Sequence, residues 1–131
     1  MGFWFYMFLM TLLIPGVMLV FGHRFKTKGA PRKINFFYGY RTARAMKNRQ
    51  TWEFAHKKLG EYWWWLGWPA LTAALAFMPH TALKGVEAIT VTATGILGFQ
   101  LLLLCVVLVP IERALKRNFD ENGNPLGNVE V

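Results

Sequence analysis

The chain has 131 residues, 54% of them hydrophobic, and carries 15 Lys and Arg against 7 Asp and Glu, a net charge of +8. A soluble domain of this length also needs an apolar core, but it does not collect its apolar residues into a few long uninterrupted runs. Eleven of the 15 basic residues lie between Arg24 and Lys58, in one loop. Short cytoplasmic loops of membrane proteins show this distribution, so anionic lipid rather than nucleic acid is the expected partner of the charge.

Three stretches, residues 2–22, 62–79 and 88–111, contain no Asp, Glu, Lys, Arg or His. At about 1.5 Å rise per residue, a helix over each crosses most or all of a hydrocarbon layer of roughly 30 Å. We therefore predict one all-α membrane domain with three transmembrane helices. Its predicted parts, within a single domain 1–131, are spans at about 3–22, 62–79 and 87–110, a cytoplasmic loop with an amphipathic interfacial helix at 23–60, and a cytoplasmic tail at 111–131.

The first apolar run has no Lys or Arg before it and continues to a basic cluster after Gly22. A cleavable signal peptide has a basic start and a shorter apolar core, so the run is predicted to be a retained span with its N-terminus outside. Trp4 and Tyr6 are expected to anchor its outer end. Pro15 should kink the helix, and a neighbouring group must then satisfy the freed carbonyl.

The loop that follows is the only long segment that mixes aromatic, amide and cationic side chains. Its first part, from Asn35 to Arg41, is predicted to be a turn. A helical pattern starts at Ala43, and Gly60 is a plausible stop for that helix. Trp52 and Phe54 are expected among lipid headgroups, with the basic side chains facing phosphate or water, as in an interfacial helix. The alternative is a solvated basic loop whose aromatic residues pack on the protein.

The second apolar run opens with an aromatic cluster, made of Tyr62, Trp63, Trp64, Trp65 and Trp68. Such clusters are typical of a membrane interface, and a stacking platform for a sugar or base is the less favoured interpretation. Residues 80–85 then form a short connection that forces the second and third spans into an antiparallel hairpin.

The third run carries a small-residue stripe, Thr90, Thr94 and Gly98, that suits close helix packing. Gln100 is its one strongly polar side chain, and we expect that side chain to bond another helix or a backbone carbonyl.

No catalytic, metal-binding or cofactor-binding set is predicted. His23 and His56 are expected on one side of the membrane and His80 on the other, and Cys105 is the only cysteine. Glu53 and His56 are three residues apart on the predicted helix, where an exposed ion pair is favoured over an acid–base dyad. Two interpretations of the loop stay open. It is either a latch that packs the loop under the helices or a ligand site. Tyr40 and Arg41 can face a phosphate or the tail, and Asn35 and Asn48 can cap helix ends or bridge to the backbone.

The same loop resembles the signature of the SdpI family of bacterial membrane proteins, in residue order and in spacing. The matching residues are Asn35, Gly39, Tyr40, Arg41, Thr42, Met46, Lys47, Asn48, Trp52 and Ala55. Ala45 departs from the signature, which has Ser there. In that family, an immunity protein protects a toxin-producing cell against its own secreted peptide. It also acts as a receptor that holds a transcriptional repressor at the membrane.

The resemblance implies a non-enzymatic protein of the bacterial plasma membrane, with its N-terminus outside and its C-terminus inside, that protects against or senses a membrane-active peptide. Expected partners are a bilayer with anionic headgroups, a peptide toxin and a cytoplasmic regulator, without nucleic acid. The alternative is a small accessory subunit of a larger membrane complex, and self-association is left open. A lipid-modifying enzyme is disfavoured because no general base is positioned near the basic turn.

Overall fold

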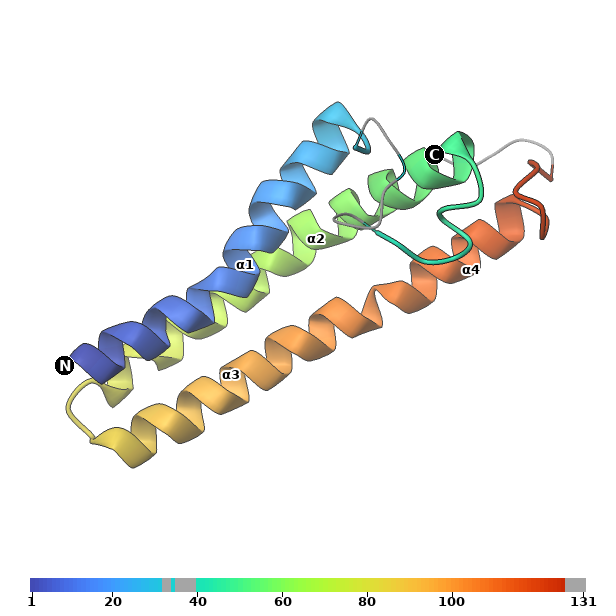
Figure 1. Cartoon of the computed structure of the whole chain (residues 1–131). Helices are drawn as coiled ribbons and strands as arrows, with labels where there is room; N and C mark the ends of the chain where they lie inside the picture. The colour runs from blue at the N-terminus through green and yellow to red at the C-terminus, as the bar shows by residue number, and fades with distance from the viewer. Residues whose placement is uncertain (32–33, 35–39, 127–131) are drawn as a thin grey trace.

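The computed structural model describes residues 1–31, 34 and 40–126, which form helices that run up, down and up again (Figure 1). The elements in order are α1 (Gly2–Lys28), α2 (Arg49–Phe77), the 3-10 helix η1 (Pro79–Thr81), α3 (Val86–Val106) and α4 (Leu108–Asn118). Over these residues no β-strand forms, and one isolated bridge joins Phe119 to Pro125. The all-helical class is as predicted.

Two helical segments are long and apolar enough to cross a membrane: Gly2–Lys28, and Val86–Asn118, which joins α3 and α4. In each, only 22% of the apolar window is buried inside the molecule, so most of its apolar side chains face outward. A core helix of a soluble protein buries such side chains, because water solvates them poorly. Helix α2 is not among the two, and the expected span at 62–79 stays a prediction.

The expected division of residues 43–79 into two helices is wrong, because α2 is one continuous helix from Arg49 to Phe77. It begins six residues later than predicted, at a capping box. The Asn48 side chain accepts from the Thr51 N–H at 2.9 Å, and the Asn48 N–H donates to Thr51 Oγ1 at 3.1 Å. This reciprocal pair satisfies two groups that the helix start leaves unbonded, and the predicted capping role of Asn48 is confirmed.

The predicted helix stop at Gly60 is wrong, because the helix continues through this residue. A glycine is needed here because α1 packs closely against α2. Gly60 lies inside α2, where α1 passes so close that a Cβ at position 60 would be 2.6 Å from the Lys26 backbone nitrogen. On α1, a Cβ at Gly22 would lie 2.9 Å from the Trp64 nitrogen. Small residues at such crossings let two helix backbones touch.

The buried apolar residues form two clusters along the bundle. One lies near the N-terminus and η1, where Met78, Ile89 and Ile96 pack with Trp4 and Phe8. The other lies at the opposite end, which we call the loop end, and its largest members are Phe25, Tyr40, Phe54, Leu59, Ile111, Leu115 and Phe119.

Gln100 joins three helices and is fully buried. Its Nε2 donates to the Thr11 carbonyl of α1 at 2.8 Å and to the Ala70 carbonyl of α2 at 3.3 Å. The Thr11 carbonyl needs this donor because residue 15, four positions on, is proline and has no N–H. Both predictions, a backbone partner for Gln100 and a neighbour that satisfies the carbonyl freed by Pro15, are confirmed.

This pairing predicts an energetic coupling between Gln100 and Pro15. We expect Gln100→Leu to destabilise the protein less in a Pro15→Ala background than in the native one, by about 1 kcal/mol, because alanine at this position supplies the missing N–H. Unfolding of the four proteins by SDS in mixed micelles, followed by circular dichroism, measures the coupling. Thr94→Leu, an exposed change on the same helix, should show no coupling with Pro15→Ala. Equal costs of Gln100→Leu in both backgrounds would contradict the pairing.

The stripe of Thr90, Thr94 and Gly98 is exposed, because the face of α3 that packs inside carries Ile89, Ala93, Ile96 and Gln100. The break in the helix lies at Val107, and α4 continues through Pro110 to Asn118, so the end of the span near Pro110 stays a prediction. Pro110 cannot donate to the carbonyl four residues earlier, so the helical ladder is interrupted just before it.

Candidate functional site

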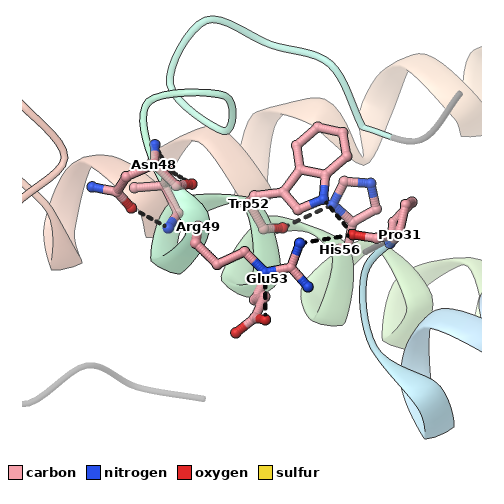
Figure 2. A network of polar contacts seen from close by, with 7 residues as sticks. Pro31, Asn48, Arg49, Trp52, Glu53 and His56 are labelled. Carbon is pink, nitrogen blue, oxygen red and sulfur yellow. Dashed lines mark hydrogen bonds and ion pairs between the residues drawn. The ribbon is translucent and has the colours of Figure 1, made fainter. Parts of the chain in front are cut away.

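The signature loop is tied to α2 through the carbonyl of Pro31 (Figure 2). That oxygen accepts a hydrogen bond from Trp52 Nε1 at 3.0 Å and another from Arg49 Nη1 at 3.1 Å. Trp52 is fully buried. One backbone group that follows α1 is therefore held by two side chains from the first turns of α2.

His56 holds the loop at a second point and is fully buried. Its Nδ1 lies 2.8 Å from the Trp52 carbonyl, which can only accept, so Nδ1 carries the proton. Its Nε2 then accepts from the Tyr40 N–H at 2.8 Å. Burial, with a smaller contribution from the charge of Arg49, lowers the pKa of His56 to about 4. The contact with Tyr40 requires the neutral ring, because a protonated Nε2 cannot accept.

The side chain of Tyr40 connects the loop to α4. Its hydroxyl donates to Glu112 Oε1 at 2.7 Å, and Arg44 Nε lies 3.7 Å from Glu112 Oε2. Tyr40 is buried, and burial together with the hydrogen bond to the Glu112 carboxylate raises the pKa of its hydroxyl. The phenol therefore stays protonated and donates at physiological pH.

The segment after α4 returns to the same loop. Asn48 Nδ2 donates to the carbonyl of Gly123 at 2.7 Å, so this residue both caps α2 and binds the tail. Gly123 has φ 84°, and a Cβ there would lie 2.5 Å from Asn48 Nδ2, so only glycine fits without strain. The rings of Phe54 and Phe119 meet edge to face at 5.5 Å beside this contact.

These contacts support the latch interpretation for five of the eight signature residues that the structure describes. We call the set formed by Pro31, Tyr40, Asn48, Trp52, His56, Glu112 and Gly123 the latch. Ala55 is buried beside it, and Thr42 Oγ1 accepts from the Ala45 N–H at 3.3 Å. Ala45, where the signature has Ser, is also fully buried, and its carbonyl accepts from Thr51 Oγ1 at 3.0 Å.

The remaining signature residues are half-buried, exposed or outside the described ranges. Met46 is half-buried, whereas Arg41 and Lys47 are exposed at the surface of the latch. Asn35 and Gly39 lie outside the described residues. Arg41 and Lys47 are thus the two exposed cations among the signature residues that the structure describes.

Two expectations about α2 are wrong. Trp52 and Phe54 are buried in protein rather than placed at a lipid surface, because the loop and α4 cover them. Glu53 does not pair with His56. It accepts from Arg49 Nε at 2.9 Å, one turn earlier, while His56 is buried and bonds the Trp52 carbonyl and the Tyr40 N–H. The sequence held a usable signal for His56, which lies one turn after Trp52 and three residues before Leu59, on the apolar side of the helix.

Among the described residues, the latch consists of packing contacts and hydrogen bonds between segments. Over the described ranges, no three His, Cys, Asp or Glu side chains meet in a way that could hold a metal ion. His56 is sealed from solvent, and both of its ring nitrogens are engaged. The latch can couple the movements of α2, α4 and the loop that connects α1 to α2.

Comparison with known proteins places the chain in a family. A family model described as the SdpI/YfhL protein family matches residues 32–111, more than half of the chain. The matched range contains the signature loop, α2 and α3. Searches of curated proteins and of solved structures each gave no match. The chain belongs to the SdpI/YfhL protein family and, with its two long apolar helices, is a membrane protein.

Proposed function

We propose that this protein protects a bacterium against a membrane-active peptide, or senses that peptide, without catalysis. It does so from the plasma membrane, with its N-terminus outside and its loop end in the cytoplasm. Family membership supports the role, and the 11 basic residues between Arg24 and Lys58 support the orientation. The C-terminal half of α2 acts as the third span in this proposal.

The observation that carries the proposal is the latch. Through Tyr40 and Asn48 it joins one loop to α2, to α4 and to the segment after α4. A peptide that enters the bilayer and shifts α3 relative to α2 would move α4, because α4 continues α3 after a single-residue break. The latch would carry that shift to the loop, where Arg41 and Lys47 are exposed to a cytoplasmic regulator.

This role predicts that Arg41 is needed for protection. In a sensitive bacterial host that expresses the protein, we expect Arg41→Ala to reduce survival in the presence of the peptide by at least about fivefold, a coupling of the usual allosteric size. The measurement is survival against peptide concentration at equal membrane levels of each variant. Arg113→Ala removes an exposed cation from α4, outside the latch, and should leave survival unchanged.

Two results would reject the role. The first is full protection by Arg41→Ala at normal expression. The second is a native protein that protects against none of a panel of membrane-active peptides.

An accessory subunit of a larger membrane complex is the second candidate. The exposed stripe of Thr90, Thr94 and Gly98 favours it, because small residues on an outward face allow close approach of another helix. Purification in mild detergent would return a partner in fixed stoichiometry if this candidate is correct. A second copy of the chain in that position would indicate a homo-oligomer.

A further inference from the structure

A groove of about 440 Å³ lies at the loop end of the molecule, outside the latch. Its walls come from the end of α1, the first turns of α2 and the residue after α4. The lining residues are Lys28, Gly29, Ala30, Arg49, Gln50, Glu53, Phe54, Lys57 and Phe119.

The charges in the groove are not balanced. Three cations line it against one carboxylate, and Glu53 is already held by Arg49 at 2.9 Å. Within the described part of the chain, Lys28 and Lys57 form no ion pair, and both are exposed. Two ammonium groups that line one groove, with no ion-pair partner among the described residues, favour an anion between them.

The backbone of Lys57 lies at the depth of a lipid headgroup, and that of Lys28 lies just beyond its outer limit, from which a long flexible side chain can reach back. Gly60 contacts Gly22, which ends the charge-free part of α1. Counted from that level toward the loop end, Lys57 is three residues away, or about 5 Å at 1.5 Å per residue. Lys28 is six residues away, or about 9 Å. The headgroup layer extends roughly 5–8 Å beyond the hydrocarbon on each side. The Lys26 ammonium lies 5.9 Å from the ring centre of Trp64 beside this level, an arrangement typical of a membrane interface.

The part of the groove lined by Gln50 and Glu53 suits a headgroup that carries hydroxyl groups. Gln50 offers an amide that can donate and accept, and the Glu53 carboxylate accepts. Arg49 cannot serve as a second phosphate site, because Glu53 and the Pro31 carbonyl already hold its guanidinium.

We propose that this groove binds the phosphate of an anionic lipid between Lys28 and Lys57, with a hydroxylated headgroup directed toward Gln50 and Glu53. The proposal is independent of the proposed function, because neither lysine belongs to the latch or to the exposed pair Arg41 and Lys47.

The test is lipid retention by the purified, delipidated protein, measured by native mass spectrometry with phosphatidylglycerol and phosphatidylcholine in equal amounts. We expect the native chain to retain phosphatidylglycerol preferentially. Lys28→Gln with Lys57→Gln should reduce that preference by roughly tenfold, since each lysine near a membrane surface contributes to anionic lipid binding. Lys116→Gln with Arg117→Gln removes the same charge from exposed positions on α4 and should leave the preference unchanged.

A survival assay with the Lys28 and Lys57 variant separates this proposal from the previous one. Lost lipid preference with retained protection supports the groove alone. An equal loss of preference in both double variants would overturn the proposal in favour of diffuse charge attraction. Binding of soluble glycerol phosphate as tightly as phosphatidylglycerol would also overturn it, because the ligand would then be a soluble phosphate ester.

Discussion

Gly60→Ala should lower the free energy of unfolding by about 2–3 kcal/mol, the cost of overpacking a well-filled contact. The added methyl group would lie 2.6 Å from the Lys26 nitrogen and 2.9 Å from the Gly22 oxygen. Both are backbone atoms of α1, so no side-chain rotation can relieve the clash. The helices must separate, and the apolar residues packed around this crossing, Phe25 and Leu59 among them, would lose contact.

The measurement is SDS unfolding in mixed micelles, followed by far-ultraviolet circular dichroism. Gly98→Ala is the matched control, because Gly98 is also inside a helix but a Cβ there meets nothing within 4 Å. That variant should be as stable as the native protein or slightly more stable, since alanine favours a helix over glycine. A Gly60→Ala protein within about 0.5 kcal/mol of the native stability would contradict the close crossing.

Acidification should destabilise the latch through His56. The pKa of His56 is about 4 in the folded protein, against the ordinary histidine value of 6.5 that applies to the unfolded chain. Between these values the unfolded chain binds a proton that the folded protein does not, so stability falls as the pH drops from about 6.5 to about 4. The depressed pKa corresponds to a loss of about 3 kcal/mol over that window, with no further loss from His56 below it.

Unfolding free energies measured from pH 7 to pH 4.5 test this expectation. In His56→Gln the slope should flatten, because glutamine does not titrate and its amide oxygen can still accept from the Tyr40 N–H. His80→Gln changes an exposed histidine within η1 and should keep the native slope. If the native protein and His56→Gln lose stability in parallel as the pH falls, the hydrogen bond from the Tyr40 N–H to the neutral His56 ring is contradicted.

Some of the site was predictable because its causes are local in sequence. The capping box needs only Asn48 and Thr51 at a spacing of three, so the sequence offers Asn48 as a helix cap, although the helical pattern itself starts at Ala43. Of the eight signature residues within the described ranges, five lie in or beside the latch. The spacing of Glu53 and His56 predicts an exposed ion pair, but spacing alone does not show that His56 lies on the buried side of α2.

The continuity of α2 was not predictable from the same pattern. Glycine followed by a charge and then by an aromatic cluster is a reasonable helix stop, and Gly60 shows all of these features. The helix continues because α1 packs against Gly60, and this contact joins residues more than 30 positions apart. Local propensity is weak enough for such packing to override it.

The sequence alone determined the class of protein, because charge-free runs long enough for a bilayer and a concentrated basic loop depend only on composition along the chain. It also determined that Pro15 and Gln100 each needed a partner, since a freed carbonyl and a buried amide both cost free energy when unbonded. Only the tertiary structure decided that they are joined to each other, and that Tyr40, His56, Glu112 and Gly123 meet in one latch. Those pairings depend on which distant segments come together, and helix packing, rather than any local pattern, decides that.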